Sequence, residues 1–224
     1  MKKYSGLVLL CLLGNAAVWA EPVAATIKEV AGKVEYKLPQ QEWQQAKTGD
    51  TLMAGTLIST GFKSTAIITT GTATVTVKPI TRLSIDELIQ SNGTAKTQLF
   101  LKTGRVRAEV HPAAGEKADF SVRSPTATAS VRGTEFEFDG YSLAVEHGSV
   151  LFNSGIGIAY TVGGGRFSAL NSDGTVAAPI AAITGSLDSA FDDIENLRYN
   201  QGLDNRPELF TQQTEQEIEV TVGW

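Results

Sequence analysis

Hydrophobic and polar residues alternate with a period of two along most of the chain, from about residue 26 to residue 178. The runs TATVTV and LFLKTGRVRAEV each place valine or leucine on one face and threonine or charged residues on the other. Alternation of this kind predicts β-strands with one buried face. Valine and threonine are β-branched and favour such a pleated surface. We therefore expect a domain built mainly of short strands.

Turn signals separate these runs at regular intervals. Thr-Gly pairs occur at positions 48–49, 60–61, 70–71 and 103–104, and Asp-Gly pairs at 139–140 and 173–174. Glycine adopts a positive φ without a Cβ clash, which suits tight turns. We expect a hairpin-like turn at Ala31-Gly32 and another hairpin turn at residues 163–165. Such spacing predicts an all-β fold, either a two-layered sandwich of short strands or a β-solenoid-like arrangement.

The last part of the chain has a different pattern. Ser186 is a suitable N-cap, and apolar residues follow it at helical spacing, with acidic residues on the other faces. These apolar residues are Leu187, Phe191, Ile194 and Leu197. We expect one amphipathic helix, then a tail that ends at Trp224. The expected organisation is a signal peptide over residues 1–20, an all-β domain over 21–180, and an acidic helix and tail over 181–224.

The first twenty residues resemble an export signal. Lys2 and Lys3 precede the apolar run LVLLCLLGNAAVW, and Ala20 ends a small-residue cleavage pattern. We therefore expect a periplasmic or extracellular protein with no membrane span in its mature form. A lipoprotein signal at Cys11 is disfavoured, because Leu10 stands where a small residue is expected. Cys11 is the only cysteine, so the mature protein would have no disulfide and no thiol ligand.

Charge is distributed unevenly. Residues 21–185 contain 15 acidic and 15 basic side chains, whereas residues 186–224 contain 9 acidic side chains and two arginines. The chain shows no basic stripe that would track a phosphate backbone. We therefore expect no nucleic-acid partner.

Residues with catalytic or metal-binding potential are few. His111 and His147 lie next to turn residues and do not form a recognised metal-ligand spacing. No nucleophile motif is present, and Glu135 and Glu137 alternate as they would on an exposed strand face. We expect no enzyme activity, no metal and no cofactor.

An ordered set of motifs resembles the FecR domain. The segments are VAGKVEY, GDTLMAGTLISTGFKSTA, LFLKTGRVRAEV, FSVRSPTATASVRGTEFEF, LAVEHGSVLF and YTVGGGRFSALNSDGTV, and the resemblance extends from about residue 27 to residue 176. The segment FSVRSPTATASVRGTEFEF is similar to the family's V-R-G-T hallmark. The positions that carry the resemblance, which we interpret as structural, are Trp43, Gly49, Gly55, Gly61, Pro125, Arg132, Gly133, Thr134, Phe136 and Gly148. Trp43 is expected to cover the core or an edge of the sheet.

The resemblance implies a role in signalling. Known members place this domain beyond the inner membrane, where it receives a signal from an outer-membrane receptor, and bind a sigma factor in the cytoplasm. We expect this chain to begin with an export signal in place of the cytoplasmic segment and span. We therefore expect a non-catalytic exported protein-binding or signalling module, with a carbohydrate or cell-wall binding module as the alternative. Possible partner contacts are Leu187, Phe191, Ile194, Leu197 and Trp224.

The segment Arg132-Gly133-Thr134 interrupts a strand and has two interpretations. In the structural one, Gly133 permits a bulge or a bend between sheets, and Arg132 caps carbonyls or pairs with a carboxylate such as Glu135 or Glu137. Thr134 hydrogen-bonds the bend. In the functional one, Arg132 binds an anionic ligand or a partner's carboxylate. The structural interpretation is favoured, since polar groups in bends are usually satisfied locally.

Overall fold

The protein is all-β in the part that the computed structural model describes, which is residues 24–181 except 92, 113 and 116. Eighteen strands form two nine-stranded sheets, and no helix occurs among these residues. Sheet A contains, in spatial order, β4 (Thr51–Leu52), β1 (Ala25–Ala31), β6 (Thr65–Thr69), β7 (Ala73–Val77), β10 (Val106–Val110), β13 (Glu135–Phe138), β14 (Ser142–His147), β17 (Arg166–Ala169) and β18 (Ile180–Ala181). Sheet B contains β3 (Gln44–Gln45), β2 (Val34–Lys37), β5 (Leu57–Thr60), β8 (Arg82–Ser91), β9 (Thr94–Thr103), β11 (Lys117–Arg123), β12 (Thr128–Val131), β15 (Ser149–Asn153) and β16 (Tyr160–Gly163).

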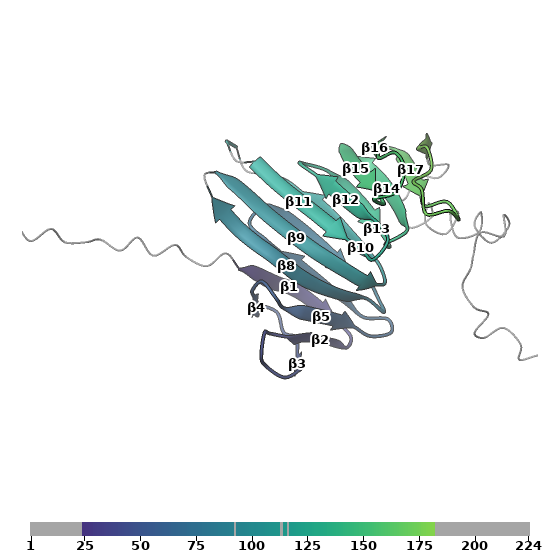
Figure 1. Cartoon of the computed structure of the whole chain (residues 1–224). Helices are drawn as coiled ribbons and strands as arrows, with labels where there is room; N and C mark the ends of the chain where they lie inside the picture. The colour runs from purple at the N-terminus through teal and green to yellow at the C-terminus, as the bar shows by residue number, and fades with distance from the viewer. Residues whose placement is uncertain (1–23, 92, 113, 116, 182–224) are drawn as a thin grey trace, which may run out of the picture.

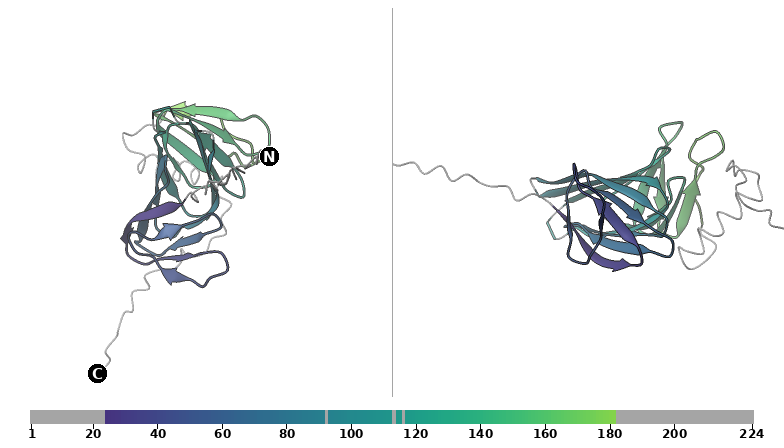
Figure 2. Two further views of the ribbon diagram at one scale, coloured as in Figure 1. Left: turned by 90° about the vertical axis from the view of Figure 1, so that its left-hand side faces the viewer. Right: turned by 90° about the horizontal axis from the view of Figure 1, so that it is seen from below.

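The chain crosses repeatedly between the sheets while it advances along both of them. Pairs of consecutive strands such as β6–β7, β8–β9 and β13–β14 form hairpins within one sheet, and the next connection passes to the other sheet. All pairings are antiparallel except that of β9 with β11. The two layers face each other in Figures 1 and 2. The predicted two-layered all-β sandwich is therefore confirmed.

The core lies between the sheets and is made by the residues that the alternation predicts to point inward. Phe120 of sheet B contacts Phe136 of sheet A edge-to-face, with ring centroids 6.3 Å apart. Phe138 and Phe152 form a second such pair at 6.0 Å. All four rings are fully buried. Edge-to-face aromatic pairs add to the free energy gained from burial itself, so these rings bind the two sheets together.

Two turns differ from the expectation. The turn at Ala31-Gly32 does not close a hairpin, because β1 belongs to sheet A and β2 to sheet B. The glycine turn at residues 163–165 likewise passes from β16 in sheet B to β17 in sheet A. Glycine supplies the same positive φ to a hairpin and to a crossing, so the local sequence does not distinguish them.

Two of the expected segments lie outside the described residues. These are the signal peptide over residues 1–20 and the amphipathic helix with its tail after residue 181. Within the described part of the chain, no helix has the length and apolar character needed to cross a membrane.

Candidate functional site at the RGT turn

The segment Arg132-Gly133-Thr134 is a connection between the two sheets. It leaves sheet B at the end of β12 and enters sheet A at the start of β13. The backbone of Thr134 exchanges two hydrogen bonds with Val110 of β10, with N–O distances of 3.2 and 3.0 Å. The turn thus begins the pairing of β13 with β10.

Thr134 joins this crossing to the next one. Its side chain is buried, and its Oγ1 donates a hydrogen bond of 2.9 Å to the carbonyl oxygen of Ser149. The same Oγ1 accepts a hydrogen bond of 3.3 Å from the Ser149 amide. Gly148, at φ 83°, forms the crossing from β14 to β15 directly beside it. A Cβ at Gly148 would lie 2.7 Å from the carbonyl oxygen of Gly133, so the two crossings pack too closely for any side chain there.

Arg132 does not make the ion pair that the sequence suggested. Its side chain is exposed, and the carboxylates of Glu135 and Glu137 pair with two other arginines. Arg107 binds Glu135, and Arg105 binds Glu137. The reason is geometric: Arg107 lies in β10, which pairs with β13 in sheet A, and Arg105 immediately precedes β10, whereas Arg132 lies in the turn before β13.

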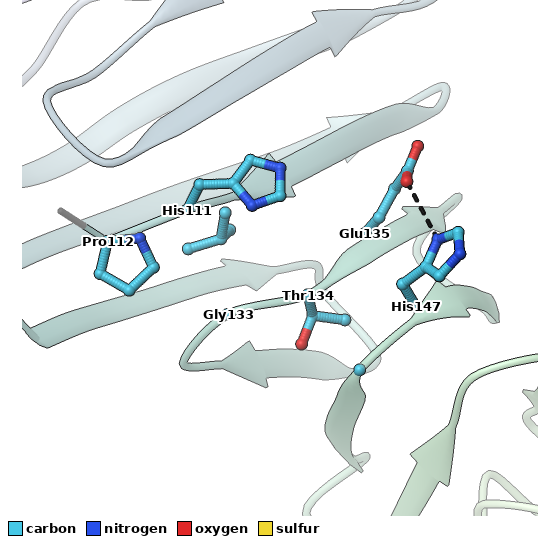
Figure 3. A pocket seen from close by; sticks show the side chains of 8 residues that line it. His111, Pro112, Gly133, Thr134, Glu135 and His147 are labelled. Atoms are coloured by element: carbon cyan, nitrogen blue, oxygen red, sulfur yellow. Dashed lines mark hydrogen bonds and ion pairs between the residues drawn. The ribbon is translucent and has the colours of Figure 1, made fainter. Parts of the chain in front are cut away.

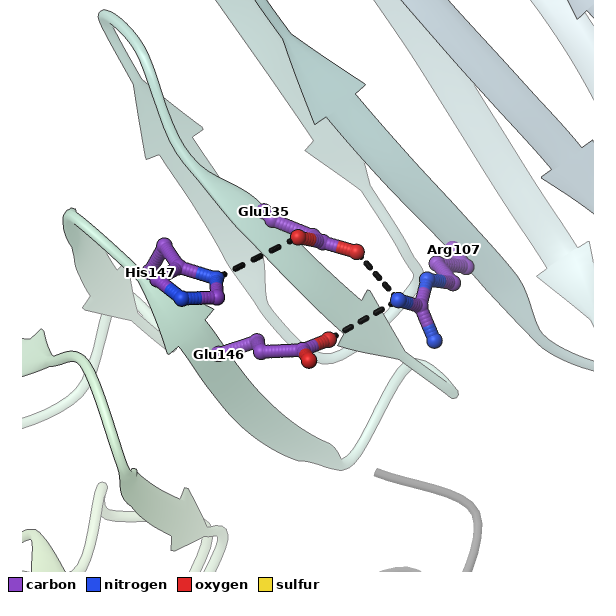
Figure 4. Close-up of polar contacts among 4 residues, drawn as sticks. All are labelled: Arg107, Glu135, Glu146 and His147. Carbon is purple, nitrogen blue, oxygen red and sulfur yellow. Dashed lines mark hydrogen bonds and ion pairs between the residues drawn. The ribbon is translucent and has the colours of Figure 1, made fainter. Parts of the chain in front are cut away.

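A cluster of four polar side chains lies on the outer face of sheet A next to the turn. Arg107 donates hydrogen bonds to Glu135 and to Glu146, the latter at 2.8 Å. His147 Nδ1 lies 3.3 Å from the second carboxylate oxygen of Glu135. Figure 4 shows one guanidinium nitrogen of Arg107 joined to both carboxylates. We name these four residues the Arg107 cluster.

Electrostatics in this cluster favour the charged forms. Burial by itself raises the pKa of Glu135, but the hydrogen bond and the charge of Arg107 outweigh it and hold the pKa below its ordinary value. Burial lowers the pKa of Arg107, and its carboxylate partners Glu135 and Glu146 reverse that effect and raise it. Arg107 and Glu135 therefore stabilise each other in their charged forms.

The cluster also contains a set of possible metal ligands that the sequence did not indicate. One ligand atom each from Glu135, Glu146 and His147 lies within 4.8 Å of the others. Two carboxylates and an imidazole are suitable donors for a divalent cation. However, the Arg107 guanidinium already provides the positive charge between the carboxylates. The β13–β14 hairpin brings Glu135 beside Glu146 and His147, and the pairing of β10 with β13 adds Arg107 from a more distant part of the sequence.

Glu137 is buried, contrary to the expectation that it lies on an exposed strand face. Its side chain is fully buried, and its Oε1 lies 2.9 Å from Nε of Arg105. It also pairs across strands with Arg107 of β10 and Ala144 of β14. A buried carboxylate needs a charged or hydrogen-bonding partner, so Arg105 is a structural requirement of this part of sheet A.

Two hollows flank the turn. The first, of about 350 Å³, is lined by His111 and Pro112 on one side and by Glu135 and His147 on the other (Figure 3). The second, of about 390 Å³, is lined by Arg132 and by residues of the outer face of sheet B such as Asp119 and Thr161. Both hollows share Gly133 and Thr134. The turn therefore forms a ridge between two depressions, and Arg132 borders the second of them.

The remaining motif positions are spread along the sandwich. Gly49, Gly55 and Gly61 donate backbone hydrogen bonds to Ile27, Ile85 and Lys33, and the first two have positive φ. Phe136 is in the core, and Pro125 lies in the turn between β11 and β12. Trp43 precedes edge strand β3 and is 46% exposed, so it is not part of the core. Leu187, Phe191, Ile194, Leu197 and Trp224 lie outside the described residues.

Comparison with known proteins agrees with the motifs. The model of the FecR family, described as FecR protein, matches residues 56–151, which include the RGT turn and the Arg107 cluster. No curated protein matches the chain.

Two solved structures are similar to it, both described as a "putative anti-sigma factor" from Parabacteroides distasonis ATCC 8503. The one at 2.50 Å resolution has 16% identity and a TM-score of 0.47, and the match covers 56% of this chain and 59% of that chain. The one at 1.65 Å has the same identity and TM-score and covers 64% and 74%. The match thus spans about three fifths of the first of these proteins.

The family match and the position of the V-R-G-T hallmark at a sheet crossing lead to the same assignment. Residues 56–151 of this chain match the FecR family model and form a FecR domain.

Proposed function

We propose that this protein is a non-catalytic signalling module of the cell envelope that works by binding another protein. Its FecR domain is the observation that carries the proposal. The export signal expected over residues 1–20 would place that domain outside the cytoplasm.

The partner surface that fits this function best is the ridge at the RGT turn. Arg132 is exposed and borders the second depression, and arginine is well suited to bind a partner's carboxylate with two parallel hydrogen bonds. Protein partners commonly fill such depressions with side chains around a central arginine. The hydrogen bond of Thr134 to Ser149 and the close packing of Gly148 against Gly133 fix the conformation of the turn. The surface is therefore preorganised for a partner.

Site-specific photo-crosslinking in intact cells tests this proposal. A photoreactive residue at Ser130 or Leu151, which line the second depression, should capture one discrete protein that mass spectrometry can identify. Arg132→Ala should reduce this crosslink at least about tenfold without changing the melting temperature. Arg123→Ala, at an exposed arginine of strand β11 in the same sheet, is the matched control and should leave capture unchanged.

Two outcomes would contradict the proposal. If Arg132→Ala lowers the melting temperature as much as it lowers capture, the arginine is structural. If capture yields no protein and the purified chain instead binds isolated cell-wall glycan, the carbohydrate-binding alternative takes precedence. Mass spectrometry of the protein recovered from the envelope fraction checks export, which predicts a mature chain that begins at Glu21.

A further inference from the structure

The end of the sandwich opposite the RGT turn presents four crossing loops side by side. Strand β10 relates the two ends of the sandwich. Its first residue, Val106, pairs with Val77, and its last residue, Val110, is hydrogen-bonded to Thr134 of the RGT turn. The loops beside Val77 therefore lie at the end opposite the turn. The four loops contain residues 32–33, 61–64, 78–81 and 104–105. We name them together the basic loop face.

Backbone hydrogen bonds fix these loops to one another. The amide of Gly61 donates to the carbonyl of Lys33 at 2.8 Å, and the amide of Ile80 donates to the carbonyl of Gly61 at 3.2 Å. The amide of Lys78 donates to the carbonyl of Arg105 at 3.0 Å. The basic loop face is therefore one connected surface and not four independent loops.

Two large apolar side chains project from this face. Phe62 is 75% exposed and Ile80 is 61% exposed, and both stand in adjoining loops because Ile80 bonds to Gly61. Single exposed apolar side chains are ordinary, but two at neighbouring loop tips form a small exposed apolar patch, which is typical of an interaction site.

The backbone under these tips is strained. Lys63 has φ 51° and Ile80 has φ 54°, and they are two of only three non-glycine residues with positive φ in the described part of the chain. A positive φ is a rare conformation for a β-branched residue such as isoleucine. Glycine or asparagine would adopt it at lower cost. An isoleucine that is both strained and exposed does not serve folding stability, and strain of this kind collects at functional positions.

The charged residues within the four loops are all basic. The loops contain Lys33, Lys63, Lys78 and Arg105 and no acidic residue. Lys33 and Arg105 pair with Glu35 and Glu137, which lie outside the loops. The Nζ of Lys63 lies 5.5 Å from the centre of the Phe62 ring, so an ammonium group stands directly beside the apolar tip.

A binding partner of this face must accommodate the protruding apolar side chains and must carry negative charge next to the basic residues. An anionic phospholipid surface has both properties, since phenylalanine and isoleucine enter the boundary between headgroups and acyl chains while lysines remain with the phosphates. We infer that the basic loop face docks the protein peripherally on an anionic phospholipid membrane, with Phe62 and Ile80 inserted. This inference is independent of the protein partner proposed above, which meets the opposite end of the sandwich.

Vesicle co-sedimentation of the purified protein tests the inference. The protein should bind vesicles of equal parts phosphatidylglycerol and phosphatidylcholine, and bind pure phosphatidylcholine at least about tenfold more weakly. The double variant Phe62→Ser, Ile80→Asn should lose at least about tenfold in binding, because asparagine keeps the left-handed backbone and removes the apolar tip. Lys63→Glu should weaken binding to the anionic vesicles selectively. The control Ile89→Ser removes an apolar side chain that is 44% exposed on strand β8 and should bind as the unaltered protein does.

Insertion itself has a separate readout. In Phe62→Trp, tryptophan emission should shift to the blue on addition of the anionic vesicles, and lipids brominated on their acyl chains should quench it. Absence of binding to anionic vesicles, equal binding by the double variant, or an unshifted emission with bound vesicles would each overturn the inference. Capture of a protein by a crosslinker at position 62, with no vesicle binding, would assign the face to a protein partner instead.

Discussion

Thr134 and Ser149 are joined by two hydrogen bonds through a single hydroxyl group, although they belong to different crossings between the sheets. The Thr134 hydroxyl is buried and both donates to and accepts from the Ser149 backbone. The threonine of the V-R-G-T hallmark is therefore the point where the β12–β13 crossing is fixed to the β14–β15 crossing.

Replacing that hydroxyl should destabilise the fold. In Thr134→Val the backbone amide and carbonyl of Ser149 lose a buried partner, which should lower the free energy of unfolding by about 1–3 kcal/mol. Urea unfolding measures the change. The control Thr161→Val, on the exposed face of edge strand β16, should stay within about 0.5 kcal/mol of the unaltered protein. Equal stability of the two variants would show that the hydroxyl does not hold the crossings together.

Gly148 should not tolerate even one additional carbon. In Gly148→Ala the new Cβ would meet the carbonyl oxygen of Gly133 at 2.7 Å and the Thr134 hydroxyl at 2.9 Å, at a positive φ. We expect a loss of about 2 kcal/mol or more in the free energy of unfolding. Gly71→Ala is the matched control, because a Cβ there meets nothing within 4 Å and the φ is ordinary. Thermal unfolding of both variants compares them directly, and a melting temperature for Gly148→Ala equal to that of the control would contradict the prediction.

The buried ion pair in sheet A gives a third prediction. Arg105→Met would leave the carboxylate of Glu137, which is fully buried, without this arginine. Loss of one partner from a buried pair costs about 3 kcal/mol or more in the free energy of unfolding. Lys33→Met, which removes one partner from the exposed pair with Glu35 at 3.4 Å, should change stability by less than about 1 kcal/mol. Chemical denaturation that ranks the two variants in the reverse order would refute the structural role of Arg105.

The Arg107 cluster should make stability sensitive to acid. Because Arg107 holds the pKa of Glu135 below its ordinary value, this carboxylate stabilises the fold above that ordinary pKa, and the contribution is lost as the pH falls through the lowered pKa of the folded state. Urea unfolding at about pH 6 and about pH 3 should show a smaller difference in Glu135→Gln than in the unaltered protein. Glu42→Gln, at an exposed carboxylate near edge strand β3, should keep the full difference.

The sequence alone determined the type of fold and the inward rows of the core. Alternation at Val106, Ala108 and Val110 identified strand β10 and its buried face, since a period of two is a direct consequence of strand geometry. The order of the FecR motifs likewise located the RGT turn. These features depend on neighbours along the chain, which a sequence records.

Only the tertiary structure decided which strands became neighbours in space. The glycine at position 32 permits a hairpin or a sheet crossing equally well, and the choice depends on where β1 and β2 find pairing partners. For the same reason the sequence predicted an exposed Glu137 and offered Glu135 or Glu137 as a partner for Arg132, whereas in the structure Glu137 is buried and pairs with Arg105. Lateral pairing depends on contacts between residues far apart in the chain, and burial of a charge depends on what covers it, so neither follows from local periodicity.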